Sequence, residues 1–240
     1  MSSAKFKKIK LNYIALFPAK SKSQRVPGKN FKKFYNKPMI CWPLKEASKS
    51  KIFDKIFISS DSIRHVKLIK NFDIKNFIKR PKKLISKSSS VNDVIRHAIK
   101  QIEKKYEFKN LCLIYPTSVL LKHSDLIKAN KIHKSNKDSF VISITKIPNI
   151  LERSFLKGKN KQLKLINKKI YKSTFKKHSQ NFSEKYEDCG NFVYGSKEIW
   201  VKTKHPYLSK IIGYIMPRSR AVDLNDIEDY DLVKKLFKSK

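Results

Sequence analysis

Short apolar runs alternate with longer amphipathic stretches along the first 145 residues of the chain. A short apolar run that ends at polar or turn-forming residues is typical of a strand buried on both faces of a sheet. On this basis we predict five strands, at residues 12–18, 55–59, 75–78, 111–115 and 140–145.

The stretches between these runs have the spacing of helices that pack on a sheet. We predict helices at residues 38–50, 62–71, 91–106 and 123–135. The third has apolar residues along one face, at Val91, Val94, Ile95, Ala98, Ile99 and Ile102. Strands that alternate with helices predict an α/β fold with a doubly wound, mainly parallel sheet.

This periodicity is lost between residues 148 and 183, where Lys, Asn and Ser dominate. We predict that this segment leaves the main sheet as a hairpin or an oligomer arm. Residues 188–195 and 210–216 then predict two further strands, and residues 227–237 predict a closing helix. We expect one domain over residues 1–240, with residues 148–183 as an excursion that serves dimerisation or the substrate site.

The composition excludes a disordered basic tail, because 40% of the 240 residues are hydrophobic and can form a core. The formal net charge is nevertheless +37, which is typical of proteins that bind nucleic acid. Only seven of the 56 basic residues are Arg, the residue that nucleic-acid readers favour. We favour compositional drift over a nucleic-acid surface and leave the second interpretation open. Under either interpretation, the positive electrostatic field of the protein attracts anionic ligands.

The remaining composition points to an intracellular protein. Cys41, Cys112 and Cys189 lie far apart with no CxxC motif, which fits a reducing compartment and argues against zinc or disulfide chemistry. No apolar run is long enough to span a membrane, and residues 1–10 lack the apolar core of a secretory signal. We expect a cytoplasmic protein with no membrane partner.

The first polar loop carries the chemistry that an anion would need. Residues 18–30 read PAKSKSQRVPGKN and follow the first predicted strand, at the sheet edge where ligands bind in open parallel sheets. A triphosphate requires cations and backbone N–H donors within a short span, and this loop has Lys20, Arg25 and Lys29 beside Gly28. A solvated basic loop is the alternative. The loop is neither a Walker motif nor a dinucleotide fingerprint.

The motif P-A-x(3)-S-x-R-V-P-x-K-N resembles the opening signature of the acylneuraminate cytidylyltransferase family. Further short matches follow in order along the chain: KPMI at 37–40, FDKI at 53–56, SSD at 59–61, RP at 80–81, HA at 97–98, PTS at 116–118 and Asp223. Residues 186–192 resemble the Y-x-D-A-G-Q-F stretch of the pseudaminic acid branch, and Arg153 also suits that branch.

This resemblance implies a Rossmann-like nucleotide-sugar transferase fold and a Mg²⁺-dependent reaction. CMP would pass from CTP to the anomeric hydroxyl of a nine-carbon acidic sugar of pseudaminic or sialic type, with release of pyrophosphate. The resemblance also implies a homodimer. A basic nucleic-acid-binding module and a degenerate homologue with weak activity are the alternatives.

The resemblance assigns roles by position. The catalytic cations that hold the phosphates would be Lys20, Arg25 and Lys29. The nucleotide would be bound by Ser23, Asn30, Arg80, Ser88, Ser89 and Ser90. The sugar would be bound by Thr117, Ser118, Arg153, Gln180, Asp188, Asn191 and Arg218. The structural alternatives are a surface cation for Arg80, an ordinary turn for residues 117–118, and a solvated side chain for Arg218.

The expected metal ligands are Asp223 and Asn225. The family shows D-x-D here, and this chain has Asn225 in the second position. An amide oxygen can coordinate Mg²⁺ but carries no charge, so we expect a lower metal affinity. The first loop also departs from the family, because Ser21 and Lys22 replace two glycines. This change restricts close approach of the backbone to phosphate.

Overall fold

The computed structural model describes residues 8–23, 25–86, 89–148, 151–174, 176–178 and 181–238. These residues form two units. The larger unit contains the chain up to Ile144 and again from Asp188 onward, and the smaller unit contains Thr145–Glu187. The predicted excursion at residues 148–183 lies inside the smaller unit.

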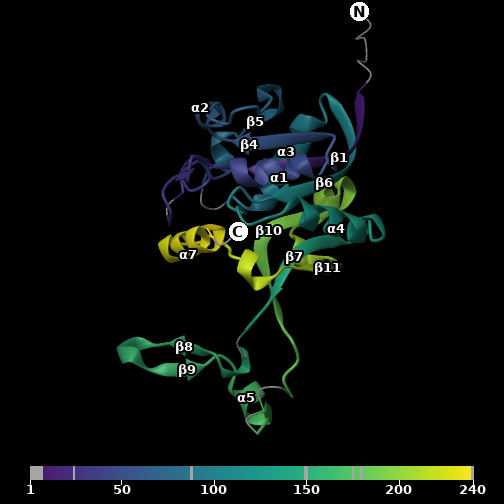
Figure 1. Cartoon of the computed structure of the whole chain (residues 1–240). Helices are drawn as coiled ribbons and strands as arrows, with labels where there is room; N and C mark the ends of the chain where they lie inside the picture. Colours follow the sequence, from purple (N-terminus) through teal and green to yellow (C-terminus); the bar gives the residue numbers. More distant parts are fainter. Residues whose placement is uncertain are drawn as a thin grey trace, which may run out of the picture. The chain divides into compact units, whose positions relative to one another are not determined.

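The larger unit is built on a seven-stranded sheet with the order β11-β7-β10-β6-β1-β4-β5 (Figure 1). The strands are β1 (Ile9–Pro18), β4 (Lys55–Ser60), β5 (Phe77–Lys79), β6 (Tyr106–Ile114), β7 (Phe140–Lys146), β10 (Tyr186–Ser196) and β11 (Ile211–Ile215). β1 pairs in parallel with β4 and β6, β4 with β5, and β7 with β11, whereas β10 runs antiparallel to β6. The predicted α/β fold with a mainly parallel sheet is confirmed.

Helices cover both faces of this sheet. They are α1 (Cys41–Lys49), α2 (Ile63–Val66), α3 (Val91–Ile102), α4 (His123–Lys134), α6 (Lys197–Lys202) and α7 (Ile227–Lys238). Leu44 of α1 and Leu126 of α4 belong to the apolar cluster on one face. Ile95 of α3 and Trp200 of α6 belong to the cluster on the other face. Shorter elements are the β2–β3 hairpin (Lys33–Phe34 and Lys37–Pro38) and 3₁₀ turns at Ile74–Asn76, Lys82–Leu84, Pro206–Leu208 and Arg218–Arg220.

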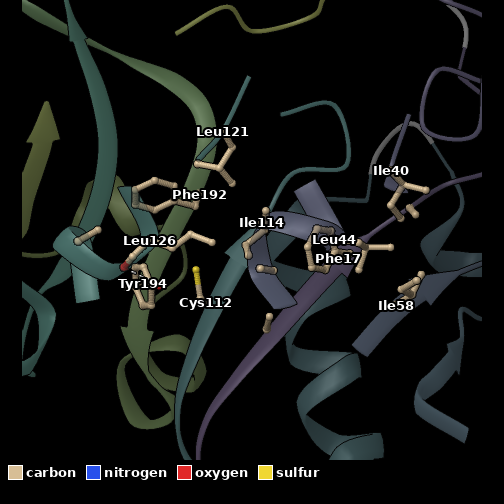
Figure 2. Close-up of a cluster of buried hydrophobic side chains, with 14 of the residues drawn as sticks. Phe17, Ile40, Leu44, Ile58, Cys112, Ile114, Leu121, Leu126, Phe192 and Tyr194 are labelled. Carbon is tan, nitrogen blue, oxygen red and sulfur yellow. Dashed lines mark hydrogen bonds between the residues drawn. The ribbon is translucent and has the colours of Figure 1, made fainter. Parts of the chain in front are cut away.

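Side chains from several strands and helices meet in the first of these clusters (Figure 2). Phe17 of β1, Cys112 of β6, Phe192 of β10 and Leu126 of α4 are all fully buried in it. Successive residues of a strand point to opposite faces, so Tyr13, Ala15 and Phe17 of β1 reach this cluster, whereas Ile14 and Leu16 reach the other. This is why the predicted strands read as continuous apolar runs.

A third cluster lies under the loops and not under the sheet. Its buried members are Val26, Phe34, Met39, Val119, Leu120, Leu224, Tyr230 and Val233. We call this cluster the loop core. Val26 comes from the loop after β1, Val119 and Leu120 from the loop after β6, and Leu224 from the segment before α7. One apolar cluster therefore anchors three loops that are far apart in the sequence.

Several predicted boundaries were wrong. The helix predicted at residues 91–106 ends at Ile102, because Tyr106 already pairs with Ile9 at the start of β6. The helix predicted at 62–71 is only the short α2, which ends at Val66, and Asn71 has a φ of +62°, which a right-handed helix does not adopt. In the strand predicted at 75–78, residues 74–76 form a 3₁₀ turn, and β5 begins at Phe77.

The smaller unit consists of a two-stranded hairpin and a short helix. β8 (Phe155–Lys157) pairs antiparallel with β9 (Leu163–Leu165), and α5 (Lys168–Thr174) follows. Lys185 forms an ion pair with Glu152 across the unit, with an Nζ–Oε1 distance of 2.6 Å. Large apolar side chains of this unit are exposed, namely Leu151, Phe155, Leu156, Leu163, Ile166 and Ile170.

Cys41, Cys112 and Cys189 are free thiols, and the last two are buried. Among the described residues, no helix has both the length and the apolar character that crossing a membrane requires.

The imidazole of His133 lies in the core, and only one of its two ring nitrogens has a hydrogen-bond partner. His133 of α4 is fully buried, its Nδ1 lies 3.1 Å from the Tyr13 hydroxyl oxygen, and its Nε2 has no hydrogen-bond partner. Burial lowers the pKa of His133 to about 4, and nearby Lys137 acts in the same direction. The folded protein therefore holds this imidazole in its neutral form.

We predict that stability falls as the pH decreases from about 6.5 towards 4. Over that range the unfolded chain binds a proton at His133 and the folded chain does not, which gives a slope of up to about 1.4 kcal/mol per pH unit. His133→Gln should flatten this dependence in urea unfolding measured at several pH values. His178→Gln, at an exposed position, is the control. An unchanged slope for His133→Gln would contradict the assignment.

Candidate active site

The basic loop after β1 is fixed at both ends by backbone contacts. Ala19 N donates to Ser59 O over 2.8 Å, and Phe31 N donates to Gly28 O over 2.9 Å. Gly28 has a φ of +61°, a left-handed conformation that glycine adopts without strain. Inside the loop, Ser23 Oγ donates to Val26 O over 2.6 Å. The loop is therefore a defined turn and not a free basic segment.

Asp61 is bound by this loop and lies near Arg80. Ser21 donates to the Asp61 carboxylate through its backbone N–H, over 2.7 Å, and through its hydroxyl. Burial acts to raise the pKa of Asp61, but the two bonds from Ser21 and the nearby Arg80 charge lower it overall. Arg80 is buried and donates through Nη2 to Ser59 O over 3.0 Å, while its Nε has no partner. Burial lowers the pKa of Arg80, and Asp61 opposes this effect.

Asn30 and Lys20 complete this side of the loop. The Asn30 amide donates to Lys20 O over 2.8 Å, and Lys20 Nζ donates to Ile85 O. Asn30 is buried and Lys20 is half-buried. Lys20 therefore links the loop after β1 to the segment that precedes α3, where Ser89 and Ser90 lie.

Lys29 brings the same loop to the segment that carries Asp223. Lys29 Nζ donates to Leu224 O over 2.7 Å. Burial lowers the pKa of Lys29, Asp223 and Asp229 raise it, and the charge of Arg25 lowers it. Lys29, Arg25 and Asp223 are therefore electrostatic neighbours, and the positive charges of the loop face a carboxylate.

A second carboxylate lies beside Asp223. A Cβ added to Gly190 would lie 3.0 Å from Asp223 Cγ, so the β10 backbone approaches this side chain closely. Gly190 N donates to Asp188 Oδ1 over 2.8 Å, and Tyr207 OH donates to Asp188 Oδ2 over 2.6 Å. Burial raises the pKa of Tyr115, and the charges of Asp188 and Asp223 raise it further. The two carboxylates and Tyr115 form one acidic cluster at the end of β6.

This cluster suits a hard cation. Mg²⁺ takes few protein carboxylates and completes its coordination with water and phosphate oxygens. No group of three or more His, Cys, Asp or Glu side chains suited to a metal occurs within the described ranges. Asn225 Nδ2 donates to Asp223 Oδ2 over 2.9 Å, so this amide orients the carboxylate. Asp226 accepts from Asp229 N over 3.0 Å at the start of α7 and serves there as a helix cap.

Two of the expected sugar ligands make internal contacts. Ser118 Oγ donates to Gly190 O and Asn191 O over 3.3 and 3.2 Å, and therefore ties the loop after β6 to β10. The Asn191 amide is buried and donates to Cys189 O over 3.3 Å. Thr117 is also buried. These residues shape the site from behind its surface.

The remaining expected residues are dispersed. Ser90 caps α3 through its contacts with Asp93, and Ser89 Oγ donates to Lys83 O over 2.7 Å. Arg218 is exposed in the turn before Asp223. Arg153 belongs to the smaller unit, where it donates to Lys177 O and lies over the Phe182 ring. Ser88 and Gln180 lie outside the described residues.

The sequence analysis assigned no role to Asp61, Tyr115 or Tyr207, which the structure places at this site. Asp61 lies in the matched SSD stretch, and Tyr115 directly precedes the matched PTS stretch. Their places in or beside these family motifs could have identified both residues from the sequence. Tyr207 follows an unpredicted helix, and no sequence pattern connects it with Asp188.

The cytidylyltransferase family model matches residues 14–210, most of the described larger unit together with the smaller one. The chain belongs to the cytidylyltransferase family. Members of this family are CTP-dependent nucleotidyltransferases, and this chain is therefore one. The family predicted from the sequence is confirmed.

Several relatives have more specific names. The pseudaminic acid cytidylyltransferase of Campylobacter jejuni is 27% identical over 226 residues, which are 94% of this chain and 96% of that protein. The N-acylneuraminate cytidylyltransferase of Escherichia coli is 26% identical over 91% of this chain and 50% of that protein. A Helicobacter pylori protein named as pseudaminic acid cytidylyltransferase and UDP-2,4-diacetamido-2,4,6-trideoxy-beta-L-altropyranose hydrolase is 30% identical over 91% of this chain and 40% of that protein.

Solved structures share the fold at low sequence identity. CMP:2-keto-3-deoxy-manno-octonic acid synthetase complexed with CTP superposes with a TM-score of 0.65 at 11% identity, over 95% of this chain and 99% of that one. The 4-diphosphocytidyl-2C-methyl-D-erythritol synthase of Anaerococcus prevotii gives a TM-score of 0.60 at 10% identity, over 96% and 99% of the chains. The nucleic-acid-binding module and the degenerate homologue are not favoured by these findings.

We predict that Asp61→Asn weakens CTP binding. The substitution removes the charge that faces Arg80 and one of the acceptors for Ser21, and a hydrogen bond to a charged group contributes about 1.5–3 kcal/mol. The KM for CTP should rise roughly tenfold or more, as measured by steady-state pyrophosphate release. Asp231→Asn, an exposed carboxylate on α7, is the matched control. Equal KM values for the two variants would rule out this role of Asp61.

Proposed function

We propose that this protein transfers CMP from CTP to the anomeric hydroxyl of a nine-carbon acidic sugar of pseudaminic or sialic type. The contact of Lys29 Nζ with Leu224 O supports this proposal most directly, because it brings the basic loop to Asp223. In the same unit, Asp61 accepts a hydrogen bond from Ser21 of that loop and lies near the charge of Arg80. Cations for a triphosphate and carboxylates for a metal thus belong to one connected set of contacts.

In the proposed reaction the anomeric oxygen attacks the α-phosphorus, and the bond from that phosphorus to the pyrophosphate oxygen breaks. The sugar oxygen loses its proton to solvent water, and negative charge builds up on the leaving pyrophosphate. Lys20, Arg25 and Lys29 would stabilise that charge, since fixed cations are most effective where charge develops. Arg80 and Asn30 would orient the nucleotide. Asp188 and Arg218 would bind the sugar, and the buried Thr117, Ser118 and Asn191 would shape its pocket from behind.

Asp223 is the proposed ligand of Mg²⁺, with Asn225 beside it. When bound, Mg²⁺ would neutralise phosphate charge and polarise the phosphoryl oxygens. Asn225 contributes no charge to this site. The nearby carboxylate of Asp188 would compensate by adding to the negative potential that attracts the cation. In this proposal, a chain with Asn225 in the second position could still bind the cation through Asp223.

The function is tested by incubating the protein with CTP, Mg²⁺ and a panel of acidic ketoses and measuring pyrophosphate and CMP-sugar. We predict turnover with a nine-carbon 5-acylamino sugar and at least a tenfold lower kcat/KM for an eight-carbon one. Asp223→Asn should lose turnover by about 100-fold or more, in line with the loss of a metal ligand, while Asp231→Asn retains it. Pyrophosphate release with none of the sugars would overturn the proposal.

We also propose that residues 148–183 form an arm that contacts a second copy of the chain. The smaller unit exposes Phe155 (53%), Leu156 (60%) and Leu163 (62%) on its hairpin. Contiguous exposed apolar side chains are typical of protein interfaces. The unit also contains Arg153 and Gln180, two of the expected sugar ligands.

We predict that replacing Phe155, Leu156 and Leu163 together by Ser shifts a dimer to a monomer in light scattering after size exclusion. The apolar area that these side chains bury against a partner contributes about 25 cal/mol per Å², and Ser removes most of it. Replacing Leu208 and Ile215, which are exposed in the larger unit, by Ser is the control. A wild-type chain that is monomeric at micromolar concentration would contradict the proposal.

A further inference from the structure

A buried ion pair lies behind the segment that carries Asp223. Arg220 donates through Nη2 to Asp125 Oδ1 over 2.9 Å and through Nη1 to Asp125 Oδ2, so the pair is bidentate. Asp125 is buried, and its side chain is 3% exposed. The Arg220 side chain is 16% exposed. A bidentate pair fixes direction as well as distance, because both planar groups must lie in one orientation.

Asp125 is held from two other directions. Tyr214 OH donates to Asp125 Oδ1 over 3.0 Å, and Lys122 N donates to Asp125 Oδ2 over 3.0 Å. Burial and the charge of Asp125 raise the pKa of Tyr214 to about 12, so its hydroxyl stays protonated and remains a donor. Asp125 thus joins β11, the first turn of α4 and the turn at Arg218–Arg220 in one network.

The segment from Arg220 to Leu224 is attached at both ends. Arg220 is bound to Asp125, and Leu224 is fully buried in the loop core with its carbonyl oxygen bound by Lys29 Nζ. Only residues 221–223 lie between these attachments, and Asp223 is one of them. A span this short leaves the Asp223 backbone little freedom once both ends are fixed.

We propose that Asp125 and Arg220 are positioning residues that hold Asp223 in place for the metal ion, and that neither touches the substrates. This inference rests on the proposed function, in which Asp223 binds Mg²⁺. The alternative is that the pair only stabilises the fold. Buried ion pairs often contribute little net stability, whereas groups that orient metal ligands change metal affinity about 10- to 100-fold when they are altered.

The test is Arg220→Gln, with metal binding measured separately from activity. Free Mn²⁺ is quantified by electron paramagnetic resonance in a titration of protein with saturating CTP and no sugar, after subtraction of a CTP-only titration. We expect about a tenfold weaker Mn²⁺ affinity and about a tenfold higher Mg²⁺ concentration for half-maximal rate. CTP affinity without metal, measured by thermal shift, should stay within about twofold of wild type, because the CTP-binding loop is untouched.

Two further variants keep the test decisive if Arg220→Gln folds poorly. Tyr214→Phe removes one hydroxyl contact with Asp125 and should weaken Mn²⁺ binding about two- to threefold with little loss of stability. Arg220→Lys retains one donor and should restore part of the affinity lost in Arg220→Gln. Lys197→Gln is the control, because it removes a 2.8 Å ion pair with Glu103 at the far end of α3.

The outcomes separate this inference from the proposed function. Lower melting temperatures with wild-type Mn²⁺ affinity in both Arg220→Gln and Tyr214→Phe would overturn the positioning role and leave the function intact. Asp223→Asn is measured alongside, and an unchanged Mn²⁺ affinity in that variant would overturn the metal assignment and this inference together. Weaker Mn²⁺ binding in Arg220→Gln and Tyr214→Phe, with Lys197→Gln like wild type, supports the positioning role.

Discussion

The site depends on one packing constraint, the loop core that joins three loops beneath the substrate side. Val26, Val119 and Leu224 come from segments up to 198 positions apart in sequence, and all three are almost fully buried in one cluster. Each loop carries polar residues of the site directly beside its apolar anchor. Burial of these anchors fixes the relative positions of cations and carboxylates before any ligand binds, which is what electrostatic catalysis requires.

Charge balance within the site follows from that packing. The chain has a formal charge of +37, and yet Asp223 lies near Lys29, Asp61 lies near Arg80, and Asp125 pairs with Arg220. Buried or half-buried cations need nearby carboxylates, because an unpaired buried charge is costly. Asp61 accepts hydrogen bonds from Ser21 and Asp125 pairs with Arg220, whereas Asp223 is exposed and Asp188 is half-buried.

Much of the fold follows from the apolar pattern, and the reasons for the misses are physical. The runs at β1, β4, β6 and β7 are buried on both faces and therefore continuous in sequence. The start of β6 at Tyr106 was missed because its residues 106–110 alternate in burial and pair with a half-exposed part of β1. The short α6 was missed because, of its six residues, only Trp200 is buried.

The site was predictable only where the family motif names its residues. The loop at residues 18–30 and Asp223 carry such motifs, and the structure connects them through Lys29 and Leu224. The partners that hold them, Asp61 for Ser21 and Asp125 for Arg220, lie 40 and 95 positions away. No local pattern encodes contacts at such separations, because they arise when the sheet brings distant loops to one edge.

A crystal structure of the protein with CTP and Mg²⁺ tests the central claim most directly. The account predicts that the triphosphate lies between the loop at residues 18–30 and Asp223, with the cytosine on the side of Arg80. It also predicts that the loop core keeps the packing described above. A nucleotide bound away from Asp223, or a triphosphate that contacts neither Lys29 nor Arg25, would contradict it.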